Sequence, residues 1–254
     1  MGTQEVLKAG LTLPSAKSKK STDFKEQKIG MIGAAKIGKS EFFAQDPNVL
    51  FIEAEAGLNH LEVFKMRARS WDDLRSIYGL LLKEKESGKF PYSMIVIDTI
   101  DRVYDFAEDV IIQRGKEFYK SIADDIHTIG DIPNGMGWAK TRELIMSFLN
   151  KLEELPCAIA FIGHLAIKKV KEGNREYDKS TINISGKTGL ELLAWADHVL
   201  HVESSMMGDK MVRRVITRPS QSKEAGSRGA MVPANWVWKD SAKENYDFFR
   251  KLFV

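Results

Sequence analysis

Gly33-Ala34-Ala35-Lys36-Ile37-Gly38-Lys39-Ser40 is the stretch that decides the fold of this 254-residue chain. It matches the pattern G-x-x-x-x-G-K-[ST] at every defined position. The apolar run 29–32 precedes the stretch, and the helix-compatible run 41–44 follows it. This position between a strand and a helix favours a phosphate-binding loop over an incidental glycine-rich turn.

The residue types in this loop suit the phosphates of a nucleotide. Glycines let backbone N–H groups converge on phosphate oxygens, and the N-terminus of the following helix adds partial positive charge. Lys39 is expected to reach the β and γ phosphates, and the Ser40 hydroxyl to bind Mg²⁺. We therefore predict that the loop binds ATP with Mg²⁺. The predicted cofactor-binding residues are Gly33, Ala34, Ala35, Lys36, Ile37, Gly38, Lys39, Ser40 and Glu41.

Outward from the loop, short apolar runs alternate with longer stretches in which apolar residues recur every three or four positions. The runs are nearly continuous in Val, Ile, Met and Phe, as in parallel strands covered on both faces. Helices are predicted from the Ser70 cap to residue 86 and over residues 140–155. This alternation predicts an α/β fold with a mostly parallel, doubly wound sheet. The predicted strands span residues 29–32, 49–53, 93–98 and 158–163.

The last third of the chain has a different pattern. Residues 168–180 are polar and charged, and the alternating runs 196–202 and 211–217 predict strands. We therefore expect loop and antiparallel additions to the sheet there. Residues 1–27 lack sustained apolar periodicity, which favours a flexible leader. The predicted organisation is this leader followed by a single domain over residues 28–254, with a β-rich C-terminal extension.

The composition bounds the surroundings of the protein. The chain has 38 Lys and Arg against 35 Asp and Glu, and the resulting net charge of +3 neither requires nor excludes a polyanionic partner. No apolar stretch approaches the roughly 20 residues that span a bilayer, and the N-terminus lacks the plan of a secretion signal. The single Cys157 lies in an apolar run, which predicts a buried residue in a reducing compartment. We expect a cytoplasmic protein without a membrane partner.

Acidic residues follow two of the predicted strands. Asp98 ends the third strand and is the second predicted metal-site residue, beside Ser40. Thr99 comes next, where ring-forming AAA+ machines usually carry the Glu that activates water. Glu55, just after the second strand, is therefore the candidate that orients the attacking water. Glu53, on the same side of that strand, is left open between a functional and a salt-bridged structural role.

Four segments in this order resemble the RecA-like core: the phosphate-binding loop and the runs 51–55, 95–99 and 161–164. More closely, the chain from about Lys28 onward resembles the RecA-like phage nucleotide-binding ATPases that include single-strand annealing recombinases. The compact spacing from the loop to the second strand is typical of that group, as is the segment 134–138.

This resemblance implies roles for residues at the strand tips. In RecA-like proteins the Glu55 position is the catalytic base, and a polar side chain at the tip of the fourth strand senses the γ-phosphate. His164 stands at that tip, where RecA itself has Gln. The predicted catalytic residues on this edge of the sheet are Lys39, Glu55, Asp98 and His164.

The resemblance also implies DNA-binding loops at residues 130–138 and 166–187. The first is expected to be flexible and carries Trp138, which could stack on a base; the second would contact phosphates. The alternatives are that Trp138 anchors the following helix and that the charges are only solvated. The basic residues of the second loop include Lys168, Lys169, Lys171 and Arg175.

Lys223 and Arg228 complete the predicted catalytic set. They lie in the segment 222–229, which resembles the Lys/Arg finger that members of this family insert into a neighbour's ATP site. A cation supplied in this way would stabilise charge on the transferred phosphoryl group and couple hydrolysis to assembly into a filament or ring. The alternative is surface charge. Residues 161–230 carry twelve Lys or Arg against eight acids, so positive charge is concentrated in this part of the chain.

The leading hypothesis is a RecA-like ATPase that binds Mg·ATP and single-stranded DNA in phage recombination or strand annealing. It would act as a homo-oligomer in the host cytoplasm, and the family suggests a single-strand DNA-binding protein as a partner. Two alternatives stay open. One is an annealing or scaffold protein with incidental hydrolysis, and the other is a P-loop small-molecule kinase, because the loop alone does not separate hydrolysis from phosphoryl transfer.

Overall fold

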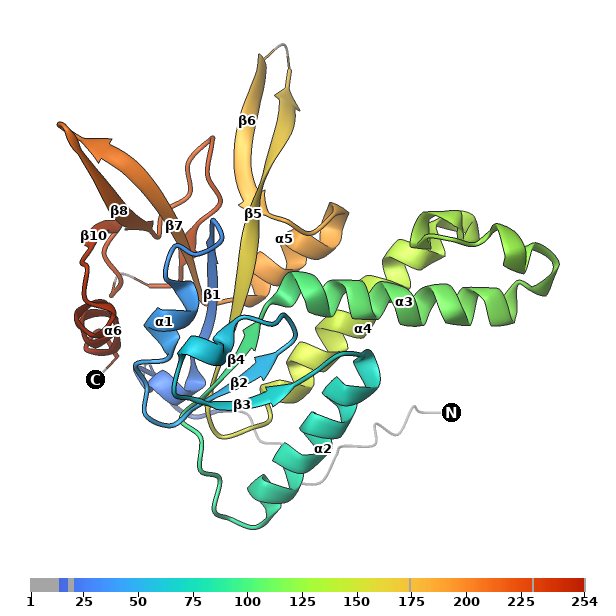
Figure 1. The fold of residues 1–254 in the computed structure, drawn as a ribbon, viewed down its shortest axis with the longest axis horizontal. Coiled ribbons are helices and arrows are strands. Elements are labelled where there is room, and N and C mark those ends of the chain that lie inside the picture. Colours follow the sequence, from blue (N-terminus) through green and yellow to red (C-terminus); the bar gives the residue numbers. More distant parts are fainter. Residues whose placement is uncertain (1–13, 18–20, 174, 230, 254) are drawn as a thin grey trace.

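The computed structural model describes residues 14–17, 21–173, 175–229 and 231–253, and one large sheet with helices around it forms its centre (Figure 1). The strands are β1 (Lys28–Gly33), β2 (Val49–Glu53), β3 (Phe64–Arg67), β4 (Met94–Asp98), β5 (Ala158–Glu172), β6 (Arg175–Ile182), β7 (His198–Met207), β8 (Lys210–Ile216), β9 (Gly226–Ser227) and β10 (Asn235–Trp238). Their order is β10-β8-β7-β1-β5-β4-β2-β3, with β6 paired to β5 and β9 to β7. Neighbours from β7 to β3 are parallel, and the other pairs are antiparallel. The predicted α/β class, with a mostly parallel sheet, is confirmed.

Helices cover both faces of the sheet, because its central strands are apolar on both faces. The α-helices are α1 (Lys39–Phe43), α2 (Trp71–Glu86), α3 (Ile100–Phe118), α4 (Met136–Leu152), α5 (Gly186–Trp195) and α6 (Ala242–Arg250). Along β5, Ile159 and Phe161 belong to the core that α2 to α5 cover, whereas Ala158 and Ala160 belong to the core under α1 and α6. The short 3-10 helices are η1 (Phe24–Glu26), η2 (Leu58–His60), η3 (Lys120–Asp125), η4 (Ile129–Asp131) and η5 (Pro133–Gly135).

Several predicted boundaries agree with the structure and others need correction. The Ser70 hydroxyl accepts a hydrogen bond from the Asp73 N–H and caps α2, as its sequence pattern predicted. Helix α4 begins at Met136, four residues before the predicted start. Strand β5 does not end at Gly163 but continues to Glu172, because β6 returns antiparallel to it and pairs the polar stretch that was expected to be partly loop.

One residue of the predicted leader packs against the domain. Phe24 in η1 is buried, and its ring meets that of Phe253 at a centroid distance of 5.7 Å. This contact lies before the predicted boundary at Lys28, where a single aromatic anchor has no periodicity to reveal it. Residues 1–13 and 18–20 of the predicted leader lie outside the described residues.

Two hairpins, β5–β6 and β7–β8, project beyond the sheet edge at which β1 ends, and the α3–α4 pair extends to one side (Figure 1). The first predicted DNA loop, residues 130–138, is not a flexible loop. Its residues form parts of η4, η5 and α4, and a Cβ on Gly137 would lie 2.0 Å from the Ile129 carbonyl oxygen. The second, residues 166–187, is the β5–β6 hairpin and its connection to α5.

Within the described residues, no helix has the length and apolar character needed to cross a membrane.

Candidate active site

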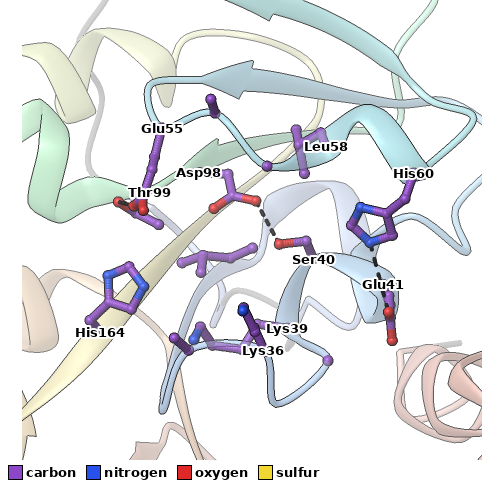
Figure 2. A pocket seen from close by; sticks show the side chains of 15 residues that line it. Lys36, Lys39, Ser40, Glu41, Glu55, Leu58, His60, Asp98, Thr99 and His164 are labelled. Atoms are coloured by element: carbon purple, nitrogen blue, oxygen red, sulfur yellow. Dashed lines mark hydrogen bonds and ion pairs between the residues drawn. The ribbon is translucent and has the colours of Figure 1, made fainter.

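A pocket of about 480 Å³ opens at the carboxyl ends of the parallel strands, where α/β sheets place their ligands (Figure 2). It brings together four predicted catalytic residues from separate elements, namely Lys39, Glu55, Asp98 and His164. The pocket is lined by Ala35, Lys36, Gly38, Lys39, Ser40, Glu41, Glu55, Ala56, Gly57, Leu58, His60, Asp98, Thr99, Ile162 and His164.

Lys39 lies inside the phosphate-binding loop. Its Nζ donates hydrogen bonds to the carbonyl oxygens of Gly33, at 2.9 Å, and Ala34, at 2.7 Å. Burial lowers the pKa of Lys39, although the carboxylates of Asp98, Asp101 and Glu55 act in the opposite direction. The ammonium group is thus held at the mouth of the loop, where a phosphate oxygen can replace the carbonyl acceptors.

Ser40 and Asp98 form the part of the site that suits a metal ion. The Ser40 hydroxyl donates to Asp98 Oδ2 at 2.6 Å, so an oxygen from the start of α1 meets one from the tip of β4. Burial raises the pKa of Asp98, against the hydrogen bond from Ser40 and the charge of Lys39. Hydroxyl and carboxylate oxygens are hard donors that fit Mg²⁺. These two residues would hold the ion, which would neutralise phosphate charge.

Glu55 is positioned by both its backbone and its side chain. The N–H groups of Ala54 and Glu55 donate to the carbonyl oxygen of Asp98, at 2.8 and 3.0 Å. The Thr99 hydroxyl donates to Glu55 Oε2 at 3.1 Å. The carboxylate of Glu55 therefore stands in the pocket beside the tip of β4, where it can accept a proton from a water molecule.

Glu53, by contrast, has a structural role. Its Oε1 accepts hydrogen bonds from the N–H groups of Gly57 and Leu58, at 3.3 and 3.2 Å, and its Oε2 lies 3.7 Å from Arg67. It is buried and shapes the turn after β2, which lines the pocket. The sequence left open a functional or a salt-bridged structural role for Glu53, and these contacts support the structural one.

His164 is the last residue of β5 that pairs with β1, opposite Gly33. Its backbone N–H donates a hydrogen bond to Asp101 Oδ2 at 2.9 Å, and its imidazole Nδ1 lies 3.5 Å from the same oxygen. Asp101 raises the pKa of His164, against the effect of burial. Sequence reasoning missed Asp101, whose only signal was its place three residues after Asp98.

Glu41 and His60 lie at another side of the pocket. The imidazole Nε2 of His60 is 3.7 Å from Glu41 Oε1 (Figure 2). Glu41 was included among the predicted cofactor-binding residues. His60 was missed, because no sequence pattern marks the turn after β2 as part of the pocket.

Lys223 and Arg228 do not line the pocket of their own chain. Lys223 Nζ pairs with Glu203 at 2.7 Å. Arg228 pairs with Asp197 at 2.9 Å, and Asp197 accepts the N–H of Lys28, which places this pair at the start of β1. Arg228 thus lies near the amino end of β1, whereas the phosphate-binding loop follows the carboxyl end of that strand. Their predicted role in a neighbouring site stays a prediction.

The sheet order, the loop after β1 and the acid at the tip of β4 define a P-loop ATPase with a RecA-like fold, in which β5 separates the loop strand from β4. A family model described as AAA domain matches residues 25–229, and the chain belongs to this family.

The chain is 26% identical over 143 residues to the SPbeta prophage-derived uncharacterized protein YorG of Bacillus subtilis (strain 168), a match that covers 56% of this chain and 42% of that protein. Among solved structures, it is similar to the KaiC-like protein PH0186 of Pyrococcus horikoshii OT3, with a TM-score of 0.48, 12% identity and coverage of 86% and 88% of the two chains. It is also similar to the flagellar accessory protein FlaH of Methanocaldococcus jannaschii, with a TM-score of 0.46 and 11% identity. That match covers 86% of this chain and 87% of the other.

Proposed function

We propose that this protein is an ATPase that acts on single-stranded DNA, in phage recombination or strand annealing in the host cytoplasm. The observation that carries the proposal is the course of β5. This strand contributes His164 to the nucleotide pocket and continues without a break into the projecting β5–β6 hairpin. The similarity to a prophage-derived protein supports the phage setting.

The hairpin has the charge that a nucleic-acid backbone requires. Five Lys or Arg stand against three acids over residues 165–182, and Lys169, Lys171 and Arg175 are exposed. Cations of this kind bind phosphates by displacing condensed counterions. Tyr177 pairs with Val170 across the hairpin and supplies an aromatic ring for base stacking. Trp138, 41% exposed at the start of α4, is a second stacking candidate.

The positions of the side chains in the pocket support hydrolysis of ATP. The loop and Lys39 bind the phosphates, while Thr99 fixes the Glu55 carboxylate that accepts a proton as water attacks the γ-phosphorus. The bond from that phosphorus to the leaving ADP oxygen breaks. His164 lines the pocket, and the raised pKa of its imidazole favours the protonated form there.

The decisive experiment is an ATPase assay with and without single-stranded DNA, beside a size measurement with ATP. We expect DNA to raise turnover and ATP to favour a larger species. If single-stranded DNA changes neither ATP binding nor turnover, the DNA part of the proposal is overturned. Annealing that persists in Glu55→Gln would favour a scaffold, and a phosphorylated small molecule in place of free phosphate would favour a kinase.

A further inference from the structure

Arg213 reaches the phosphate-binding loop from strand β8, in the C-terminal extension. Its Nη1 donates a hydrogen bond to the carbonyl oxygen of Ile37 at 3.2 Å, and its Nη2 lies 3.6 Å from Asp240 Oδ1. A Cβ placed on Gly38 would lie 3.2 Å from Arg213 Nη1 and 3.9 Å from Trp238 Cζ2. The guanidinium group therefore packs directly against the Ile37–Gly38 peptide.

This contact determines which way that peptide faces. A trans peptide is planar, and its C=O and N–H groups point in opposite directions. Arg213 binds the carbonyl of Ile37, and neither residue lines the pocket, whereas Gly38 and Lys39 do. Because the carbonyl is held on the outer side of the loop, the N–H of Gly38 points to the inner side. Inward N–H groups are what a P-loop uses to bind phosphate.

The conformation of Gly38 makes such a support useful. Its φ is +104°, in the left-handed region. Glycine adopts positive φ values about as readily as negative ones, so its own backbone preference does not fix the orientation of the peptide. A charged donor on the preceding carbonyl is a strong hydrogen bond, and it selects one orientation of the peptide.

We propose that Arg213 is a positioning residue that holds the Ile37–Gly38 peptide in its phosphate-binding orientation. The C-terminal extension is then part of the nucleotide site, through a residue that touches the loop and not the nucleotide. This role rests on nucleotide binding at the P-loop and is independent of DNA binding.

The test is equilibrium binding of a fluorescent ADP analogue to wild type, Arg213→Ala and Arg214→Ala. Arg214 is the matched control, because it is the next residue of β8 and points to the other face, opposite Glu203 and Val237. We expect the Kd for ADP to rise about tenfold in Arg213→Ala, the effect of losing one hydrogen bond from a charged group. Arg214→Ala should stay within about twofold of wild type. Arg213→Lys, which keeps one charged donor, should recover part of the loss.

Two further measurements separate positioning from general stability. Competition by inorganic pyrophosphate should weaken by the same factor as ADP binding, because the effect acts on phosphate. A lower melting temperature with an unchanged Kd would overturn the proposal, as would equal effects of Arg213→Ala and Arg214→Ala. If Arg213→Ala fails to fold, Arg213→Met, which keeps the apolar stem and removes every donor, takes its place; we expect the same rise in the Kd for ADP, and an unchanged Kd would overturn the role. Failure of wild type to bind ADP would overturn the nucleotide site itself, and this role with it.

Discussion

Thr99 Oγ1 donates a hydrogen bond to Glu55 Oε2 across 3.1 Å, and this bond joins the end of β4 to the turn that carries the candidate base. Thr99 occupies the position at which ring-forming AAA+ machines usually carry that base. Here the position supplies a hydroxyl that orients a carboxylate from the turn after β2. A carboxylate has two acceptor oxygens, so Oε1 is left to receive a water molecule.

Replacing either residue should separate hydrolysis from binding. We expect Glu55→Gln to lower the rate of phosphate release by at least about 100-fold, because the general base is lost. Thr99→Val, which keeps the shape and removes the hydroxyl, should lower that rate about tenfold. In both variants the Kd for ATP should stay near the wild-type value, and Thr99→Ser should restore the rate. A Thr99→Val enzyme as active as wild type would contradict the orienting role.

The central strands and the loop were predictable from sequence because their signals are local. Strands β1, β2 and β4 are continuous apolar runs that end in a glycine or an acid, so their bounds agree with the prediction within a residue or two. Helix α3 escaped prediction, although its apolar residues recur at helical spacing. Its N-cap residue, Thr99, makes no capping bond, because its hydroxyl serves Glu55.

The parts of the site that sequence did not predict depend on contacts between distant residues. Arg213 lies 176 residues from the Ile37 carbonyl that it binds, and Asp101 lies 63 residues from His164. No periodicity relates such positions, since the sheet order alone brings them together. The extension of β5 was missed for a similar reason, because β6 supplies its partner and the polar residues carry no strand pattern of their own.

Two buried histidines predict how stability depends on pH. Burial lowers the pKa of His198 to about 4, and burial lowers the pKa of His201 as well. An unfolded His has a pKa of about 6.5, so below that value the unfolded chain binds a proton that the native chain does not. The free energy of unfolding therefore falls as the pH falls, by about 2 kcal/mol for His198 between pH 7 and pH 5.

Urea unfolding of wild type and His198→Gln at these two pH values tests this dependence. Gln can still bond Ser227 and Gln27, the partners of the His198 ring, and it does not titrate. We expect the variant to lose less stability on acidification than wild type does. His127→Gln, at an exposed position, is the control and should behave like wild type. Equal losses in wild type and His198→Gln would contradict the assignment.

Mixing two inactive variants tests whether Arg228 acts in a neighbouring site. In this chain Arg228 pairs with Asp197, far from its own pocket. If it acts on a neighbour, Glu55→Gln chains can still supply the cation to Arg228→Ala chains, whose own Glu55 is intact. An equal mixture should then recover about a quarter of the wild-type rate, from random assembly of neighbours. A mixture of Glu55→Gln with Lys39→Ala is the control, because every site in it is damaged. Arg228→Ala chains that are as active as wild type would mean that Arg228 has no catalytic role, and no recovery in their mixture with Glu55→Gln would mean that it does not act in a neighbouring site.

The β5–β6 hairpin should set the salt dependence of DNA binding. Lys169 and Lys171 are exposed on one face of the hairpin, since they alternate along β5 opposite Asp178 and Glu176. Each phosphate contact to a single strand adds about 0.7 to the slope of log affinity against log salt. The double variant Lys169→Ala/Lys171→Ala should therefore bind single-stranded DNA more weakly at low salt, with a slope smaller by about 1.4. The matched control is Lys83→Ala/Lys85→Ala, which removes the same charge from exposed positions of α2, at the end of the molecule away from the hairpin (Figure 1). An equal change of slope in both double variants would show that net charge, and not the hairpin, governs binding. An unchanged slope in the hairpin variant would remove the hairpin from the DNA interface.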